Sequence, residues 1–227
     1  MEAQRRIRSF VLRAGRITAA QARALDELWR DYGLDAGDAA LDLDRVFGRS
    51  AARCLEIGFG TGEVIGSLAQ ANPHIDYLGI EVHRPGVGRL LLWAEHAKLT
   101  NLRVICNDAV DVMRDQLTDQ SLDEILVFFP DPWHKKRHHK RRLIVPEFVA
   151  CAARKLRTGG VLRLATDWQD YAEQMLQVCN ANTQLESLSC DATYVPRPDF
   201  RQATRFERRG ERLGHGVWDL AYSKRGP

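Results

Sequence analysis

The chain has 227 residues, 44% of them hydrophobic, and a formal net charge of +3, which suits one α/β domain that buries roughly 70–75% of its unfolded surface. No run of about 18 apolar residues is present, so we expect no membrane span, and the N-terminus lacks the apolar stretch of a secretory signal. The five cysteines are scattered, without a CxxC pair, and argue against a disulfide framework. These features predict a reduced, cytoplasmic protein.

In chain order, residues 1–16 form an arginine-rich arm, and a short helix is expected over residues 18–32 with Thr18 as its cap. From residue 52, short apolar runs alternate with longer amphipathic ones, which predicts a mostly parallel sheet with helices on both faces. The expected strands are Arg53–Ile57, Tyr77–Val82, Leu102–Cys106, Glu124–Phe129, Val161–Ala165 and Val217–Tyr222. The expected helices are Glu63–Ala71, Val87–Leu99, Ala109–Gln116, Leu143–Leu156 (ended by Gly159-Gly160) and Trp168–Asn180. We therefore divide the chain into residues 1–50, a basic arm with a short helix, and residues 51–227, the α/β domain.

A glycine-rich turn follows the first expected strand. The segment 55–62 has the pattern Glu-x-Gly-x-Gly-x-Gly, formed by Glu56, Gly58, Gly60 and Gly62. Glycines at a strand end let the backbone approach a ligand, and Thr61 is placed to cap the helix that follows. A dinucleotide fingerprint requires glycine where Glu63 stands. Because Glu56 would also repel a pyrophosphate, the pattern favours a cationic or hydroxylated ligand.

Acidic residues also stand at the ends of the next two strands. Glu81 is suited to accept the hydroxyls of a ribose, and Asn107-Asp108 follows the third strand, placed to meet an adenine edge. Ligands of such sheets bind beyond the carboxyl ends of the strands, where the strand order reverses. Taken singly, each acid is as easily a helix cap or a solvated turn residue, but three of them at successive strand ends predict one site.

The fourth strand ends in the corner Pro130-Asp131-Pro132-Trp133. The two prolines restrict the backbone on both sides of Asp131, and the fourth strand should neighbour the first. We therefore expect Asp131 to face the glycine turn across a common cleft, with Trp133 available to stack on an extruded base. Taken alone, such a corner is more simply a strand-ending turn with a packed tryptophan.

The glycine turn, together with Gly79-Ile80-Glu81-Val82, resembles the S-adenosylmethionine site of class I methyltransferases. That resemblance implies a Rossmann-like fold, a mostly parallel seven-stranded sheet in the order 3-2-1-4-5-7-6 with helices on both faces. It also implies that the glycine turn holds the methionine moiety of S-adenosylmethionine, Glu81 its ribose and Asp108 its adenine.

The segment Pro130–His138 closely resembles the bacterial single-chain tRNA (guanine-N7-)-methyltransferases, and residues 5–11, 15–16, 165–168 and 204–207 agree. The resemblance implies methyl transfer from S-adenosylmethionine to guanine N7 at variable-loop position 46 of tRNA, with Asp131 as the catalytic residue. The implied cofactor-binding residues are Glu56, Gly58, Gly60, Gly62, Glu81, Asn107, Asp108 and Asp131. The implied substrate-binding residues are Lys135, Asp167, Thr204, Arg205, Phe206 and Glu207. The implied RNA contacts are Arg137, His138, His139, Lys140, Arg141 and Arg142.

Guanine N7 carries a free lone pair, so its methylation requires no general base. We expect Asp131 to position the guanine and to stabilise the positive charge that develops on the purine.

Residues 135–142 contain six fixed positive charges. Charge runs are usually solvated surface, but this one directly follows Asp131 and Trp133, which favours contact with RNA. His134, His138 and His139 lack an accompanying set of cysteine or acidic ligands, so no metal is expected. The expected partner is tRNA, with no membrane and no obligatory protein partner.

Two other functions remain open. The first is a methyltransferase acting on another RNA or on an adenine amino group, although those enzymes place both prolines after the Asn or Asp of their corner. The second is a non-catalytic RNA-binding protein on a methyltransferase fold, which the intact glycine turn disfavours. Glu63 argues against a NAD(P) oxidoreductase.

Overall fold

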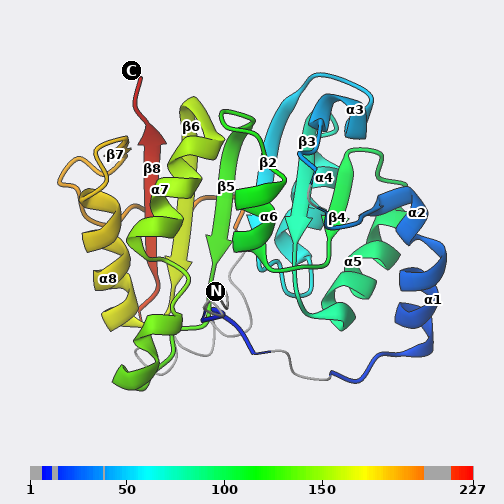
Figure 1. Cartoon of the computed structure of the whole chain (residues 1–227), viewed down its shortest axis with the longest axis horizontal. Coiled ribbons are helices and arrows are strands. Elements are labelled where there is room, and N and C mark those ends of the chain that lie inside the picture. The colour runs from blue at the N-terminus through cyan, green and yellow to red at the C-terminus, as the bar shows by residue number, and fades with distance from the viewer. Residues whose placement is uncertain (1–6, 12–14, 38, 202–215, 227) are drawn as a thin grey trace, which may run out of the picture.

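The computed structural model describes residues 7–11, 15–37, 39–201 and 216–226. One eight-stranded sheet, in the order β1-β4-β3-β2-β5-β6-β8-β7, runs through the molecule (Figure 1). The strands are β1 Gly33–Leu34, β2 Ala52–Ile57, β3 Ile75–Ile80, β4 Leu102–Ile105, β5 Leu122–Phe128, β6 Leu156–Thr166, β7 Leu185–Ser187 and β8 Trp218–Lys224. Strand β8 is antiparallel to both of its neighbours, and the other pairs are parallel.

The strand order confirms the expected Rossmann-like methyltransferase sheet. Strands β2 to β8 reproduce the order 3-2-1-4-5-7-6, and the short β1 pairs with β4 at the outer edge as an eighth strand. The strands expected from the sequence did not include β1 or β7, because segments of two and three residues are too short to carry a periodic pattern.

Helices cover both faces of the sheet. They are α1 Ala19–Glu27, α2 Trp29–Tyr32, α3 Leu43–Phe47, α4 Glu63–Ala71, α5 Arg84–Ala97, α6 Ala109–Asp115, α7 Pro146–Lys155 and α8 Gln169–Asn180, with a 3-10 helix η1 at Lys136–Arg141. Alternate residues of β2 supply two separate cores: Leu55 and Ile57 pack with α6, α7 and α8, whereas Cys54 packs with α1, α4 and α5. This two-sided burial explains why the strands read as continuous apolar runs.

The N-terminal helix begins after its Thr18 cap as expected, but it ends at Glu27, and Trp29–Tyr32 form the separate helix α2. Thr18 Oγ1 accepts the backbone N–H of Gln21 at 3.2 Å, and Gln21 Oε1 accepts that of Thr18 at 2.9 Å, a reciprocal capping box. Ala24 and Leu28 are buried in the core shared with α5. The proposed boundary at residue 50 therefore does not coincide with a break in packing.

Two local expectations about α7 are wrong. The helix begins at Pro146 rather than Leu143, because the proline takes the first helical turn. It ends at Lys155, and Gly159-Gly160 lie within β6 instead of ending the helix. A Cβ on Gly160 would lie 3.0 Å from the carbonyl oxygen of Asp123, so the close approach of β5 requires glycine there.

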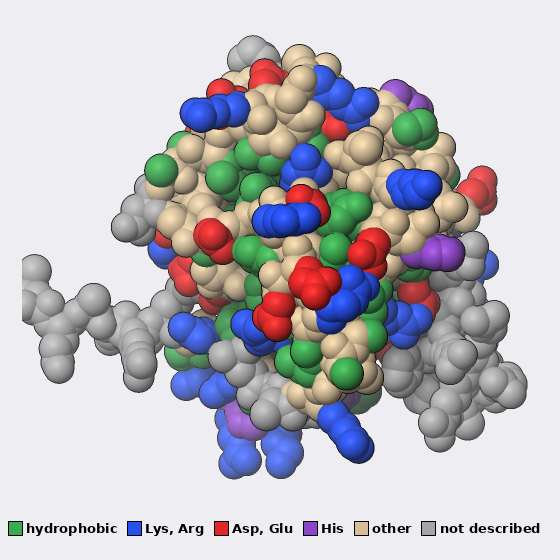
Figure 2. Space-filling model, turned by 90° about the vertical axis from the view of Figure 1, so that its right-hand side faces the viewer, with side chains coloured by type: hydrophobic (Ala, Val, Ile, Leu, Met, Phe, Trp, Pro, Cys, Tyr) green, Lys and Arg blue, Asp and Glu red, His purple; other side chains and the backbone are tan. Residues whose placement is uncertain are grey.

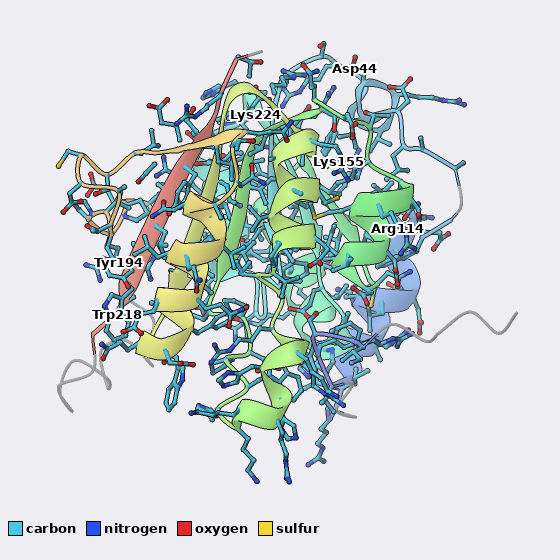
Figure 3. The ribbon with its side chains drawn as sticks, turned by 60° about the vertical axis from the view of Figure 1, so that its left-hand side comes forward. Asp44, Arg114, Lys155, Tyr194, Trp218 and Lys224 are labelled. Atoms are coloured by element: carbon cyan, nitrogen blue, oxygen red, sulfur yellow. The ribbon has the colours of Figure 1, made fainter. Side chains whose placement is uncertain are left out.

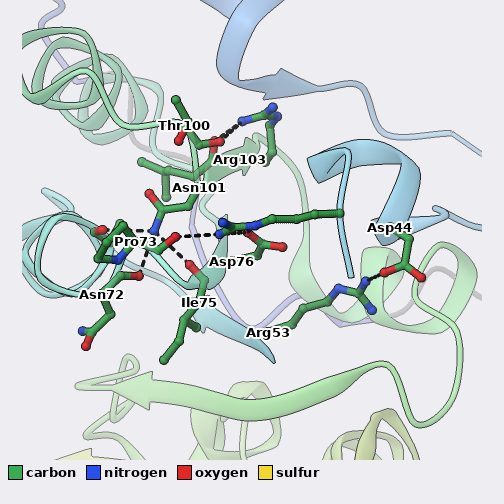
Figure 4. Close-up of polar contacts among 12 residues, drawn as sticks. Asp44, Arg53, Asn72, Pro73, Ile75, Asp76, Thr100, Asn101 and Arg103 are labelled. Atoms are coloured by element: carbon green, nitrogen blue, oxygen red, sulfur yellow. Dashed lines mark hydrogen bonds and ion pairs between the residues drawn. The ribbon is translucent and has the colours of Figure 1, made fainter. Parts of the chain in front are cut away.

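Polar side chains secure the amino ends of the central strands (Figure 4). Asn101 Nδ2 donates to the carbonyl oxygens of Ala69 and Ile75, at 3.0 and 2.8 Å, and the buried Asp76 pairs with Arg49 at 2.6 Å. These contacts are structural, and they lie at the end of the sheet opposite the strand ends considered below. Within the described residues, no helix has the length and apolar character to cross a bilayer.

Candidate functional site

A cavity of about 270 Å³ opens beyond the carboxyl ends of β2, β3, β4 and β5. Its lining includes Gly58 after β2, Glu81 after β3, Asn107 and Asp108 after β4, and Asp131 after β5. Strands β2 and β5 are neighbours, and the chain order reverses between them. The expected meeting of the glycine turn and the Asp131 corner at one cleft is therefore present.

The glycine turn takes a backbone shape that side chains would disturb. Gly58, Gly60 and Gly62 have φ of 71°, 57° and 78°, in the left-handed region. Gly62 is itself the N-cap of α4, with no side-chain capping bond, so the expected cap by Thr61 is wrong. Helix α5 packs closely on the turn, since a Cβ on Gly86 would lie 2.0 Å from the Gly60 oxygen.

The Glu81 carboxylate braces this turn. Its Oε2 accepts the backbone N–H of Gly60 at 2.8 Å, and its Oε1 accepts those of Val82 and His83 at 2.7 and 2.9 Å. Charge-assisted bonds of this kind are roughly twice as strong as neutral ones. Glu81 thus fixes the turn after β2 relative to the end of β3, in addition to lining the cavity.

Glu56 lies behind the turn and is not part of the cavity lining. The residue is 3% exposed, and its Oε2 is buried without a hydrogen-bond partner. Burial raises the pKa of Glu56 to about 8, and the charge of Glu81 contributes in the same direction. The predicted binding of the cofactor by Glu56 therefore remains a prediction.

Asp108 and Asn107 close the far side of the cavity. Asp108 is buried and caps α6 by accepting the N–H of Val110 at 3.0 Å, while Asn107 Oδ1 accepts the N–H of Asp108 at 2.7 Å. The capping role that sequence reasoning weighed for Asp108 is real, and it coexists with a place in the cavity wall.

Asp131 is exposed and lines two cavities. The second, of about 420 Å³, is bounded by Val11, Val82, His83 and the segment 131–134. Phe129 and Trp133, on either side of the corner, have φ of 53° and 50°. Such left-handed conformations are strained for aromatic residues and persist only where the surroundings impose them.

Trp133 is half-buried and held on two sides. Its Nε1 donates to the carbonyl oxygen of Ser9 at 3.1 Å, and the Arg141 guanidinium lies 4.9 Å from its ring centroid. One face of the ring is therefore occupied by a cation.

Sequence reasoning did not single out Ser9, Phe10, Val11 or His83 as lining residues, yet all four line the first cavity. His83 stands two positions after Glu81, at the end of the same strand, and this closeness in sequence could have identified it as a lining residue. Residues 9–11 belong to the segment 5–11 that supports the family resemblance, but their place at this cavity depends on tertiary packing.

The structure describes only some of the predicted substrate-binding residues. Lys135 and Asp167 are exposed and line neither cavity. The N-cap of α8 is Trp168, without a side-chain capping bond, so Asp167 is not the cap. Trp168 is 37% exposed, with the His134 ring edge-on at 4.3 Å. The segment Thr204, Arg205, Phe206 and Glu207 lies outside the described residues.

The basic segment forms η1 at the end of the molecule that carries the cavities, with side chains extending away from the sheet (Figure 3). Lys136, Arg137 and Lys140 are exposed, and His138, His139 and Arg141 are half-buried. The pKa of His138 is lowered, first by desolvation and then by the charge of Arg137 and its basic neighbours.

Arg142 is different from the rest of this segment. Only 1% of its side chain is exposed, and its guanidinium donates to partners within the protein. The expectation that Arg142 contacts RNA is therefore wrong, because a buried and fully engaged guanidinium is not presented to phosphate.

Among the described residues, the face of the molecule on the right of Figure 1 carries no concentration of positive charge like that of η1. Figure 2 shows acidic and basic side chains interspersed there, and Arg23 of α1 pairs with Glu95 of α5 at 2.6 Å. The run of consecutive positive charge is thus a local feature of the η1 end.

Solved structures share this architecture. The 16S rRNA methyltransferase KamB aligns with a TM-score of 0.60 and 16% identity over 82% of this chain and 95% of its own. The [4+2]-cyclase SpnF aligns with a TM-score of 0.55 and 18% identity over 92% and 95%. The fold and the strand-end site define a Rossmann-like, class I methyltransferase architecture. Because a cyclase shares it, the fold alone does not specify the reaction.

Sequence comparison specifies the family. Residues 50–220 match the family model described as putative methyltransferase. The tRNA (guanine-N(7)-)-methyltransferase of Stutzerimonas stutzeri is 54% identical over 97% of this chain and 93% of its own length. The protein of the same name from Pseudomonas aeruginosa is 53% identical over 97% and 90%. The chain belongs to the tRNA (guanine-N(7)-)-methyltransferase family.

Proposed function

We propose that this protein transfers the methyl group of S-adenosylmethionine to N7 of a guanine in tRNA. The observation that carries the proposal is the single cavity in which the glycine-turn residue Gly58 and the corner residue Asp131 meet. Relatives 52–54% identical over nearly the whole chain are named for this reaction, and the order of the sheet is that of the methyltransferase fold.

The residues around the first cavity fit S-adenosylmethionine. When bound, it supplies a methyl group on a positively charged sulfur. The glycine turn suits its methionine end. Glu81, Asn107 and Asp108 are hydrogen-bonding groups for its ribose and adenine.

The second cavity suits the guanine. It shares Asp131 with the first, so one carboxylate borders both spaces. Guanine N7 has a free lone pair, and no side chain has to remove a proton before it reacts. Asp131 then orients the base and stabilises the positive charge that arises on it. This electrostatic stabilisation is largest when the carboxylate is held in position before the reaction begins.

Exposed basic side chains of the protein bind the RNA backbone. The exposed side chains of Lys136, Arg137 and Lys140 extend from η1 at the same end of the molecule. Phosphate contacts of this kind fix the register of the RNA and carry no sequence information. Specificity then comes from the shape of the tRNA and from recognition of one guanine.

Nucleoside analysis tests the proposal. Unmodified tRNA incubated with the protein and S-adenosylmethionine should yield N7-methylguanosine after digestion. A different methylated nucleoside would assign the protein to another acceptor. Calorimetric binding of S-adenosylmethionine without any methylated product, across a set of unmodified tRNAs, would contradict the proposed reaction.

A further inference from the structure

We propose that Arg142 is a positioning residue, which holds the Asp131 corner in its reactive shape by clamping the Pro132 carbonyl to α8. The inference about reactivity rests on the function proposed above. The inference about the shape of the corner does not.

The clamp consists of three directed hydrogen bonds from one guanidinium. Nε of Arg142 donates to the Pro132 oxygen at 2.9 Å, Nη1 donates to Gln174 Oε1 at 2.6 Å, and Nη2 donates to Asp170 Oδ2. The Tyr171 ring lies under the guanidinium, with 4.7 Å between ring centroid and Cζ. The planar guanidinium donates hydrogen bonds in three fixed directions at once, which a lysine ammonium cannot do.

The carbonyl that Arg142 holds is the one that determines the corner. This carbonyl belongs to the peptide bond between Pro132 and Trp133, and Pro132 is the residue that follows Asp131. Orienting that peptide plane fixes the φ of Trp133, which is 50°. Since a left-handed tryptophan is strained by about 1–3 kcal/mol, the surroundings must hold it, and Arg142 is the buried charged donor that does so.

The other end of the clamp lies on α8. Asp170 and Gln174 are one turn apart on this helix, and Gln174 Nε2 also donates to the Ile144 oxygen at 3.1 Å. Helix α8 begins directly after Asp167 and Trp168. Arg142 therefore fixes the Asp131 corner relative to the segment that carries Asp167.

The first test compares Arg142→Lys with Arg30→Lys, the same exchange at an arginine of α2 whose side chain is 84% exposed. We expect R142K to lower the single-turnover rate of methyl transfer by roughly 10–100-fold, because small misplacements of reacting groups have effects of that size. The affinities for S-adenosylmethionine and tRNA, and the salt dependence of tRNA binding, should stay as in the wild type. R30K should leave the rate, both affinities and the salt slope at their wild-type values.

The second test reads the corner directly and does not depend on activity. In protein labelled with 5-fluorotryptophan, the Trp133 resonance is assigned by Trp133→Phe. It should shift or broaden in R142K and, to a smaller extent, in Asp170→Asn, and should stay in place in R30K. D170N serves also as the milder variant if R142K does not fold, because the Asp170 side chain is 61% exposed.

Three results would overturn the proposal. An unchanged Trp133 resonance in R142K and D170N would mean that the clamp does not shape the corner. A wild-type rate in R142K would mean that the clamp has no effect on the reaction. A weaker tRNA affinity in R142K, with an unchanged single-turnover rate, would return Arg142 to the RNA interface. Absence of N7-methylguanosine from the wild-type reaction would contradict the proposed function. The fluorine spectra would still show whether Arg142 holds the Asp131 corner in its shape.

Discussion

Glu81 accepts the backbone N–H of Gly60, with 2.8 Å between Oε2 and the nitrogen. This bond joins the end of β3 to the turn after β2, so one carboxylate both lines the cavity and shapes the turn beside it. The same side chain accepts two further N–H groups, from Val82 and His83.

Glu81→Gln removes the negative charge from these three bonds while keeping the size of the side chain. We expect the affinity for S-adenosylmethionine to fall about 10–100-fold, since a bond to a charged group contributes about 1.5–3 kcal/mol. Titration calorimetry measures the change. Glu63→Gln, an exposed glutamate in the first turn of α4, is the matched control and should bind normally. Equal affinities for E81Q and the wild type would contradict the bracing role.

Glu56 makes the stability of the protein depend on pH. Its pKa is raised from 4.5 to about 8 in the folded state, mainly by burial. The folded state therefore holds a proton that the unfolded state releases, so stability falls as pH rises from about 4.5 to 8, by up to about 1.4 kcal/mol per pH unit. Glu56→Gln has no such proton. The advantage of E56Q over the wild type in denaturant unfolding should grow from pH 5 to pH 8, and a difference independent of pH would exclude the effect.

Asp131→Asn separates charge from shape at the corner. If the charge stabilises the developing cation, the single-turnover rate should fall about 100–1,000-fold, while S-adenosylmethionine and tRNA bind as before. Quench-flow measurement with saturating tRNA gives this rate. Asp115→Asn, an exposed carboxylate that lines neither cavity, is the control. Wild-type turnover by D131N would remove the electrostatic role.

The exposed cations of η1 should determine the salt dependence of tRNA binding. Replacing Lys136, Arg137 and Lys140 by alanine should lower the slope of log affinity against log salt by about one for each phosphate that the protein no longer neutralises. A charge-matched triple variant of Arg30, Arg45 and Lys224 should leave the slope unchanged. Lys224 lies at the opposite end of the molecule from η1 in Figure 3. Identical slopes in the two triple variants would place the interface elsewhere.

Arg201 and Asp219 form a buried ion pair beneath the aromatic residues that precede the corner. Nη2 of Arg201 and Oδ2 of Asp219 are 2.6 Å apart, and the guanidinium lies 5.2 Å from the Phe129 ring centroid. Asp219→Asn removes the counter-charge of a buried guanidinium and should lower the free energy of unfolding by about 3–5 kcal/mol. Glu95→Gln, in the exposed pair with Arg23, should have a far smaller effect on the thermal midpoint. Similar midpoints for D219N and the wild type would contradict this estimate.

Residue type and spacing were enough to predict the fold and most of the strand-end residues. Buried parallel strands leave continuous apolar runs, and parallel strands bring their carboxyl ends to one edge, so the chain's order of residues was enough to assign Glu81, Asp108 and Asp131 to one site. The glycine pattern and the Pro-Asp-Pro corner are local in sequence, because the backbone shapes that they impose involve a few consecutive residues.

The different roles of neighbouring, chemically similar residues became apparent only from how the chain packs. Arg141 and Arg142 are adjacent in a run of positive charge, yet one lies over Trp133 and the other is buried against Asp170 and Gln174, which stand 28 and 32 residues later in the chain. In the same way, the three backbone bonds of Glu81 and the unpaired oxygen of Glu56 depend on how strands and turns pack together. Burial and bonding geometry are properties of the assembled chain, and residue type and spacing alone do not specify them.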